Sequence, residues 1–512
     1  MTAREGLLDR TPAGDVVELD GRSLAPAAVA ALAAGRAQAR LAPVARARNA
    51  AARATLEALV ANGTPVYGVT TGVGALHDRR LDPDDAPEHQ RRLLRSHAAG
   101  AGEPLAPDVV IAAMAVRLNQ LGAGGAGASD DLLDALGGAL AARVIPVVRE
   151  IGSLGTGDLP ALADIGLALT GEGEVDRGGA RAPAARALAE AGVTLLALGP
   201  RDGIALMSSN AVTIARAALI AVRARRIAEA SLTVAALSFE AVDADRSVLD
   251  ARVHAARPHP GQVAVAARMR SLLEGGAATR RRGGVHDPFA FRCQPQVDGT
   301  LHDAIARLDD VLEIELNAAA ENPLLVSDEA AALASGNFHA GALALALDGL
   351  RAALAQAASL VAARVSALLE ARYSGLRGWL ATARDTDPGV MALEYTAHAA
   401  AAEVRLLAAP ASAQHTSVGS GMESHASFAP TAARHSDLAL DRYADAVATE
   451  LAVAVRALRM RGEAPAGTGT RELFDRAAAA LPADLGNRPP AADLALARDL
   501  VAGKAVIHGG PV

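Results

Sequence analysis

Residues 343–354 read LALALDGLRAAL, with leucine at positions 343, 347, 350 and 354. The spacing i, i+4, i+7 and i+11 places all four side chains on one face of an α-helix. Similar apolar stripes recur between Val390 and Leu407 and between Leu438 and Leu458. Prolines at 323, 388, 410 and 430 stand at suitable helix ends, because proline cannot continue a helix interior. The C-terminal part of the chain is therefore predicted to be a bundle of long helices.

The N-terminal part has a different pattern, in which short helical segments alternate with glycine-rich stretches such as 68–74 and 122–127. Glycine favours tight turns and close backbone approaches. Of the 512 residues, 51% are hydrophobic but only 2% are aromatic, so small aliphatic side chains must fill the core, and alanine favours helix. We predict a mainly α protein, with an irregular, loop-rich portion at 1–205 and a long-helix bundle at 206–512. Such bundles often bury apolar stripes in subunit contacts.

Charge and cysteine content limit the class of protein. The formal net charge is −7, and basic residues are spread among acidic ones, so nucleic acid is not an expected partner. Cys293 is the only cysteine, which excludes an intrachain disulfide and is typical of a reducing cytoplasm. The first 20 residues lack the apolar core of a signal peptide, and no run of ~20 lipid-compatible residues stands out. We expect a cytoplasmic protein with no membrane span and no metal site.

Three local sequences carry more polar chemistry than packing requires. Residues 67–74 read YGVTTGVG, and such a glycine loop can hold the Tyr67 phenol over a cleft, where a lowered pKa would make it a general base. Residues 152–159 read GSLGTGDL, and glycines around a hydroxyl residue permit the close approach that internal cyclisation needs. Residues 287–297 read DPFAFRCQPQV, where Arg292 could clamp a carboxylate. Taken singly, each string is better explained by an ordinary turn, a helix entrance or a capping residue.

Taken in order, these strings resemble those of the ammonia-lyase and aminomutase superfamily, which includes histidine and phenylalanine ammonia-lyases. The resemblance runs from about residue 20 to about residue 435. It rests on separate strings: Tyr-Gly-Val-Thr-Thr-Gly at 67–72, Ser-His-Ala-Ala-Gly at 96–100, Gly-Glu-Pro at 102–104, Gly-Ser-Leu-Gly at 152–155, Arg-Cys-Gln-Pro-Gln at 292–296, Glu-Asn-Pro-Leu at 321–324 and Gly-Asn-Phe-His at 336–339. Chance does not produce this agreement.

The resemblance implies roles for particular residues. Tyr67 matches the family's base for the substrate β-proton, and Arg292 matches the arginine that binds the substrate carboxylate. Ser96 and His97 match the pair that sets side-chain preference, in the version found in histidine lyases. Glu403 matches a glutamate that the histidine lyases use against an imidazole.

The resemblance further implies that Asn337 and Phe338 line the pocket of the prosthetic group. It also implies a homotetramer of long helices, in which each site is assembled from more than one subunit.

The segment that makes the family's prosthetic group departs from the pattern. In the family, an Ala-Ser-Gly tripeptide between Gly-Ser-Val-Gly and Asp-Leu cyclises to the electrophile methylidene-imidazolone. Here only Thr156 and Gly157 lie between Gly155 and Asp158, one residue short. Either the tripeptide is lost, or Gly155-Thr156-Gly157 is a shifted version whose threonine would leave a methyl group on the electrophilic carbon. We therefore expect no methylidene-imidazolone cofactor, and little ammonia release from free histidine, phenylalanine or tyrosine.

Residues that support the electrophile in the family have also changed. A family asparagine that contacts the prosthetic group is replaced by Ser208, unless Asn210 shifts into its role. A family tyrosine is Phe289, which cannot donate a hydrogen bond. A family glutamine is His286.

Three functions follow from these residues. The first is an enzyme that works without the imidazolone and catalyses base-assisted elimination or isomerisation of a small carboxylate-bearing or carrier-bound substrate. The second is a conventional amino-acid ammonia-lyase or aminomutase. The third is a non-catalytic scaffold on the same fold. The retained Tyr67 loop argues against the third, and the altered prosthetic-group segment makes the first our main expectation.

Overall fold

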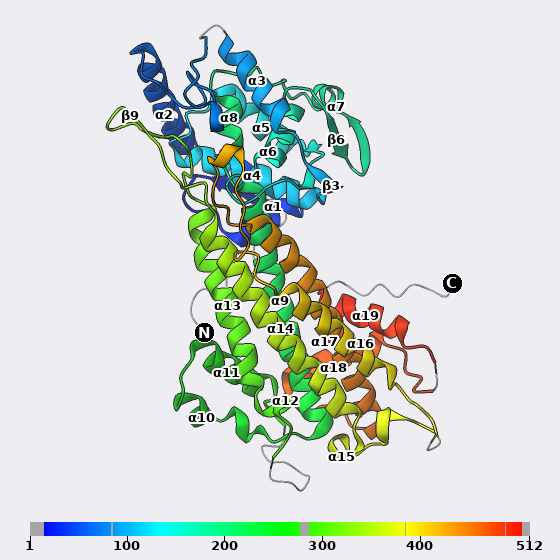
Figure 1. Ribbon diagram of the computed structural model, residues 1–512. Coiled ribbons are helices and arrows are strands. Elements are labelled where there is room, and N and C mark those ends of the chain that lie inside the picture. Colours follow the sequence, from blue (N-terminus) through cyan, green and yellow to red (C-terminus); the bar gives the residue numbers. More distant parts are fainter. Residues whose placement is uncertain (1–14, 83–84, 277–285, 384–385, 487, 504–512) are drawn as a thin grey trace. The chain divides into compact units, whose positions relative to one another are not determined.

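The computed structural model describes residues 15–82, 85–276, 286–383, 386–486 and 488–503 (Figure 1). The described residues are mostly helical, with short strands in small sheets, so the mainly α class is confirmed.

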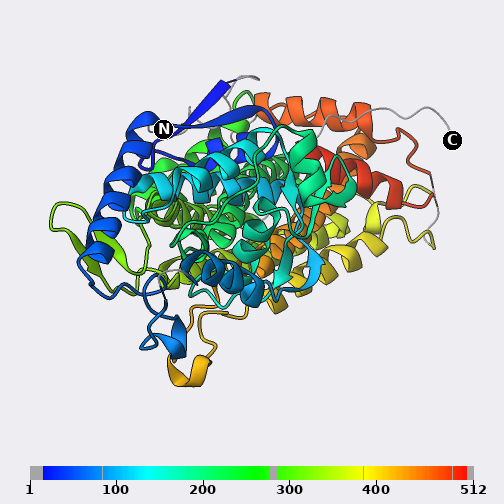
Figure 2. The same cartoon turned by 90° about the horizontal axis from the view of Figure 1, so that it is seen from above.

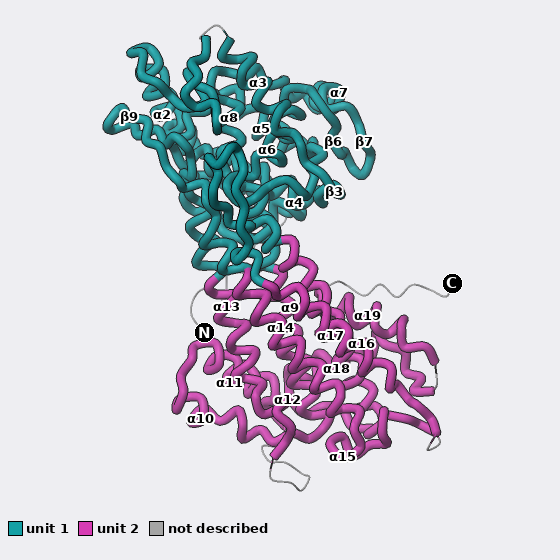
Figure 3. Tube along the Cα trace, in the orientation of Figure 1, with its two compact units in different colours: residues 1–222, 308–347, 410–433 teal, residues 223–307, 348–409, 434–512 magenta. Residues whose placement is uncertain are grey.

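Two compact units make up the chain (Figure 3), and each draws on three stretches of sequence. Unit 1 comprises residues 1–222, 308–347 and 410–433, and unit 2 comprises residues 223–307, 348–409 and 434–512. The boundary that we predicted between residues 205 and 206 therefore does not separate the compact units, because the chain enters each of them three times.

Four long helices contain the unit boundaries or adjoin them: α9 (Ala211–Val242), α13 (Gln294–Glu315), α14 (Gly341–Leu369) and α17 (Ala429–Arg461). The leucine stripe lies on α14, and its four side chains are at most 1% exposed within the single chain. The expectation that this stripe packs in subunit contacts is therefore wrong. Leu345, between the stripe residues, is instead 65% exposed.

Two helical stretches, Asp202–Val242 and Gly341–Leu369, are long and apolar enough to cross a membrane by length and composition. From the sequence we had expected no such stretch. Their most apolar windows are 89% and 61% buried inside the protein, as expected for core helices, because burial against other helices selects the same apolar composition.

Unit 1 begins with a parallel pair of strands, β1 (Asp15–Leu19) and β2 (Ala37–Leu41), joined by α1 (Pro26–Ala33). The pairing runs from Asp15↔Ala37 to Leu19↔Leu41. The other strand pairs are antiparallel: β3 (Ala101–Pro104) with β5 (Arg149–Ile151), β4 (Ile145–Pro146) with β6 (Glu174–Arg177), β6 with β7 (Ala180–Pro183), and β8 (Leu324–Val326) with β9 (Ala331–Leu333).

Helix α4 (Pro107–Ala123) lies at the centre of unit 1, since every residue from Val109 to Gly122 is buried. The remaining helices of the unit are α2 (Pro43–Ala61), η2 (Gly74–Leu76), α3 (Ala86–His97), α5 (Asp130–Ala141), α6 (Leu159–Leu169), α7 (Ala184–Glu190), α8 (Asp202–Met207) and η6 (Gly419–Gly421). The Ser129 hydroxyl caps α5 by accepting a bond from Leu132 N at 3.1 Å, a typical N-cap. Figure 2 shows α2 beside the β8–β9 hairpin, where Leu56 and Leu325 share an apolar cluster.

A close approach at Gly166 brings three site-bearing helices together. A Cβ atom there would lie 2.7 Å from Leu94 Cδ2 on α3 and 2.9 Å from Leu206 Cδ2 on α8. Only glycine permits this contact. The C-terminal parts of α3, α6 and α8 are thereby held near one another.

Unit 2 consists of helices packed around its parts of the long helices. They are η4 (Arg246–Leu249), α10 (Ala251–Ala255), α11 (Pro260–Leu272), α12 (Phe289–Arg292), α15 (Ala371–Ser374), η5 (Gly378–Leu380), α16 (Ala392–Leu407), α18 (Thr468–Ala480) and α19 (Ala491–Val501). Helix α18 packs against α11 and α19.

Candidate active site

The predicted site residues fall into two groups. Unit 1 holds Tyr67, Ser96, His97, Thr156, Gly157, Ser208, Asn210, Asn337 and Phe338. Unit 2 holds Phe289, Arg292 and Glu403.

The Tyr67 loop is fixed to the body of unit 1 on both sides of the tyrosine. Val66 and Val69 are buried in the cluster that contains Leu56. Gln90 donates from Nε2 to Gly68 O at 2.9 Å and accepts from Ile204 N at 3.0 Å, which links the loop to α8. Gly74 N donates to the Tyr67 hydroxyl oxygen at 2.8 Å. A backbone donor on the phenol oxygen stabilises negative charge there.

The charge that acts on Tyr67 in the single chain is negative. Burial raises the pKa of the Tyr67 phenol, the bond from Gly74 N lowers it, and the Glu423 carboxylate raises it. The expected lowering of the pKa is therefore not found within one chain. The sequence argument did not identify Glu423, because nothing in its local sequence indicates that the η6 segment contacts the η2 loop (Figure 2).

The turn at Gly155-Thr156-Gly157 is held by backbone and side-chain bonds. Gly155 O accepts from Ala340 N at 3.1 Å and from Ser427 Oγ at 2.9 Å. Gly157 N donates to Asn210 Oδ1 at 3.0 Å. Thr156 is only partly buried, so its side chain is the accessible one of the three.

Asn210, and not Ser208, supports this turn. Besides accepting from Gly157 N, Asn210 donates from Nδ2 to Phe338 O at 2.7 Å. Ser208 Oγ instead accepts from Asn322 N at 3.3 Å. Of the two candidates, Asn210 is therefore the one that bonds to the turn, and its role toward a prosthetic group stays a prediction.

Asp158 fixes the turn to the start of α9. Its carboxylate accepts from Thr213 N at 2.7 Å and from Thr213 Oγ1 at 2.9 Å. Burial raises the pKa of Asp158 to about 6, against the effect of these bonds. The Asp158 amide also donates to Ser209 O at 2.7 Å, so α6 and α9 start from one hydrogen-bonded junction.

A buried arginine network lies behind that junction. Arg117 donates to Glu321 Oε1 at 2.9 Å and to Leu206 O at 3.0 Å. Ser209 Oγ donates to Gln120 Oε1 at 2.6 Å. These contacts fix the segment that carries Ser208 and Asn210. The helical pattern of α4 alone does not indicate that the polar residues of this helix point inward to carbonyl groups.

His97 has a defined tautomer when neutral. Its Nδ1 lies 2.8 Å from Leu93 O and 3.0 Å from Ser96 Oγ. Because a carbonyl oxygen only accepts, Nδ1 carries the proton and Nε2 is left as an acceptor. Among the described residues, nothing bonds to Nε2.

Asn337 and Phe338 lie in the turn before α14. The Asn337 side chain is exposed, and Phe338 is partly buried, with its carbonyl bonded to Asn210. The next residue, His339, bonds from Nε2 to His425 Nδ1 at 2.9 Å. The sequence argument did not identify His425.

In unit 2, Arg292 is the last residue of α12 and is partly buried. Its guanidinium lies over the Phe289 ring, 5.3 Å from the centroid, and Phe289 is 69% exposed. The neighbouring Phe291 is buried against Phe239, which anchors α12. Within the described ranges, no carboxylate pairs with Arg292.

Glu403 lies on α16 and lines a cavity of about 580 Å³ within unit 2. Arg442, Asp445 and Arg498 line the same cavity, and Arg498 Nε pairs with Asp445 Oδ1 at 2.8 Å. The role of Glu403 against a substrate imidazole stays a prediction. The carboxylate that raises the pKa of Tyr67 is Glu423.

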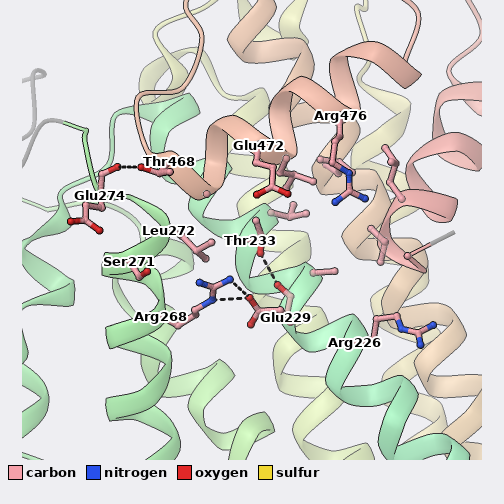
Figure 4. Close-up of a pocket in the computed structure, with 18 residues that line it drawn as sticks. Arg226, Glu229, Thr233, Arg268, Ser271, Leu272, Glu274, Thr468, Glu472 and Arg476 are labelled. Carbon is pink, nitrogen blue, oxygen red and sulfur yellow. Dashed lines mark hydrogen bonds and ion pairs between the residues drawn. The ribbon is translucent and has the colours of Figure 1, made fainter. Parts of the chain in front are cut away.

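A second cavity of unit 2, of about 520 Å³, lies among α9, α11, α18 and α19 (Figure 4). Glu229 pairs with Arg268 at 2.6 Å, and the Thr468 hydroxyl donates to Glu274 O at 3.2 Å. None of the predicted site residues lines it. Among the described residues, no group of three or more His, Cys, Asp or Glu side chains could hold a metal ion.

The chain is similar in sequence to known proteins. Residues 24–479 match the aromatic amino acid lyase family. Histidine ammonia-lyase of Geobacillus kaustophilus is 38% identical over 82% of this chain and 84% of its own. The Gloeobacter violaceus enzyme of the same name is 37% identical over 91% and 92%.

Solved structures agree as well. The ergothioneine-degrading enzyme ergothionase from Treponema denticola superposes with a TM-score of 0.91 at 28% identity, covering 96% of this chain and 100% of that one. Histidine ammonia-lyase from Trypanosoma cruzi superposes with a TM-score of 0.89 at 30% identity, covering 95% and 93%. The match over most of the chain, the relatives at more than 30% identity and the shared fold show that this chain belongs to the aromatic amino acid lyase family.

Proposed function

We propose that this lyase removes an amine from the α-carbon of a small substrate with the histidine skeleton and leaves an α,β-unsaturated carboxylate. The names of its relatives support this substrate class: the sequence relatives are histidine ammonia-lyases and a structural relative degrades ergothioneine. They favour the second of the sequence-based functions, a conventional amino-acid ammonia-lyase or aminomutase, over the first and over a scaffold.

The observation that carries the proposal is the position of the Tyr67 oxygen, held by Gly74 N–H on a loop of the same unit as the Gly155 turn. In this mechanism the Tyr67 oxygen takes the β-proton, the C–H electron pair forms the Cα=Cβ bond, and the C–N bond breaks. His97 Nε2 accepts the N–H of the substrate imidazole. Arg292, from whichever subunit of the assembly supplies it, binds the carboxylate as a bidentate partner.

The turn does not fit the family's Ala-Ser-Gly ring. Only Gly155-Thr156-Gly157 is available, and an alanine in place of Gly155 would put a Cβ atom 2.0 Å from Ser427 Oγ. Gly155 also has φ +87°, which disfavours any other residue. We therefore propose that residues 155–157 remain an ordinary peptide, and no step of the mechanism passes through an imidazolone.

This turn affects which amine can leave. A primary amine is a poor leaving group without an electrophile to activate it, whereas a trimethylammonium group leaves directly as a neutral tertiary amine. Ergothioneine is a betaine with such a group. The short turn therefore favours a histidine betaine over histidine itself as the substrate.

The test is to incubate the purified protein with L-histidine, N,N,N-trimethyl-L-histidine and ergothioneine, and to measure free amine and the absorbance of the conjugated product. We expect an intact mass equal to the unmodified chain, and faster turnover of the betaines than of L-histidine. A mass lower by two waters together with rapid ammonia release from L-histidine would contradict the ordinary peptide and restore a conventional ammonia-lyase. No turnover of any of the three would contradict the substrate class.

We further propose that the enzyme is a cytoplasmic homotetramer acting on a free small molecule. Exposed apolar side chains support assembly, among them Ile314 on α13 at 70% and Leu406 on α16 at 75% exposure, since large exposed apolar residues mark contact surfaces. A sedimentation mass of one chain at micromolar concentration would exclude the tetramer. Binding of a carrier protein stays a prediction.

Replacing Glu423 with glutamine is expected to move the pH profile of kcat/KM to lower pH. The Glu423 charge raises the pKa of Tyr67, and the base is the phenolate, so activity rises as pH passes through that pKa. Removing the charge lowers the pKa and shifts the rising limb down. Glu57→Gln is the matched control, because Glu57 is an exposed glutamate on α2. An unmoved limb, or one moved to higher pH, would show that Glu423 does not act on Tyr67.

A further inference from the structure

The stretch from Glu423 to Ser427 contacts the candidate site at every second residue. Glu423 acts on the Tyr67 phenol, His425 bonds to His339, and Ser427 Oγ donates to Gly155 O. One short segment therefore acts on the base through the charge of Glu423 and contacts the turn through Ser427, with His425 between them.

The histidine pair joins the two segments that bond to Gly155. His339 Nε2 lies 2.9 Å from His425 Nδ1, with the ring centroids 5.0 Å apart. His339 directly precedes Ala340, whose N–H is one donor to Gly155 O. His425 stands two residues before Ser427, which is the other donor. The ring pair is thus a second link between the two segments whose donors meet at Gly155 O.

The tip of this segment is exposed, and it is held by few contacts besides those of η6 with the η2 loop. Most residues from Ala413 to His425 are exposed. A single bridge between Val418 and Glu423, with N–O distances of 3.0 and 3.3 Å, shapes its tip. At its far end, Phe428 N donates to Leu154 O at 2.8 Å. Exposed backbone with few buried contacts opens readily.

We propose that His339 and His425 are positioning residues: their mutual hydrogen bond holds the stretch from Glu423 to Ser427 so that it aligns the Tyr67 base with the Gly155 turn. The pair does not touch the reacting atoms, and it acts through Glu423, Ser427 and Ala340. The inference rests on the proposed function for its effect on turnover, but its effect on Tyr67 is independent of any substrate.

The experiment compares His425→Ala, His339→Ala and the double variant His339→Gln/His425→Asn in the full-length protein. The amide of glutamine reaches about where Nε2 lies and that of asparagine about where Nδ1 lies, so the double variant can restore an uncharged hydrogen bond. His415→Ala is the matched control, because His415 is exposed in the same segment. The ionisation of Tyr67 is followed by ultraviolet difference absorbance against Tyr67→Phe, which requires no turnover.

Both alanine variants should shift the Tyr67 titration to lower pH, because Glu423 is no longer held beside the phenol. They should also reduce kcat by up to roughly 10²-fold, with a smaller change in KM, since a displacement of about 1 Å can have that effect. The Gln/Asn variant should restore both values, and His415→Ala should change neither.

An unchanged Tyr67 titration in both alanine variants would overturn the inference. So would a folded Gln/Asn variant that restores neither the titration nor kcat. If no histidine-skeleton substrate is turned over, the proposed function fails, but the titration still decides whether the pair positions Glu423.

Discussion

Tyr67→Phe is expected to lower kcat/KM by about 10²–10⁴-fold, the usual cost of losing a general base, while the protein stays folded and assembled. The substitution removes the oxygen and keeps the ring, so the buried packing of the loop at Val66 and Val69 is preserved. Gly74 N loses its acceptor, but the partly exposed loop lets water replace it.

The same residue explains an expected pH dependence. An unperturbed phenol has a pKa near ~10, and burial and Glu423 raise that of Tyr67 further in the single chain. The base form is therefore scarce at neutral pH unless assembly or substrate binding supplies a cation. The rate should rise with pH through the range where Tyr67 ionises.

Rates are measured with whichever histidine-skeleton substrate turns over fastest, and Tyr373→Phe on α15 is the matched control. Circular dichroism and sedimentation establish that Tyr67→Phe keeps its fold and its mass. A Tyr67→Phe protein that retains the full rate would exclude the acid–base mechanism and leave the glycine loop as architecture.

Arg364→Ala is expected to destabilise unit 2 by about 3–5 kcal/mol, as found when one partner of a buried ion pair is removed. Arg364 and Glu450 are both fully buried and form a bidentate pair, with Nε–Oε1 at 2.7 Å and NH2–Oε2 at 2.9 Å. Removing the guanidinium leaves the Glu450 carboxylate in the core with only the Ser238 hydroxyl at 2.7 Å. Asp298 is buried nearby, and its pKa is raised to about 6 by burial, so a second carboxyl loses its nearest cation.

The measurement is the denaturant midpoint at constant protein concentration, since assembly also affects stability. Arg186→Ala is the control: it breaks the exposed Arg186–Glu190 pair and should leave the midpoint in place. The double variant Arg364→Met/Glu450→Leu should recover most of the loss, because apolar residues of similar volume replace a buried pair at little cost. If Arg364→Ala unfolds at the same midpoint as the parent, the pair does not stabilise the core.

Patterns of residues close together along the chain were sufficient to predict the helices and the family. The leucines from 343 to 354 repeat with the helical period, so α14 could be predicted from residues close along the chain. The motif strings are also local, and the match over residues 24–479 confirms the family that they implied. Tyr67, Asn337 and Arg292 could be identified as candidates for the same reason.

Contacts between distant residues were decided only by the tertiary structure. Ser427 bonds to Gly155 across 272 positions and His339 to His425 across 86, and no local pattern encodes such pairs. Asn210, rather than Ser208, faces Gly157 because of how the chain leaves α8, which spacing alone left open. Folding decides which surfaces meet. It therefore decides whether an apolar stripe faces its own core or another subunit, and whether Glu423 lies where it raises the pKa of Tyr67. Burial and Coulomb energies are set by distance in space, and the sequence states only distance along the chain.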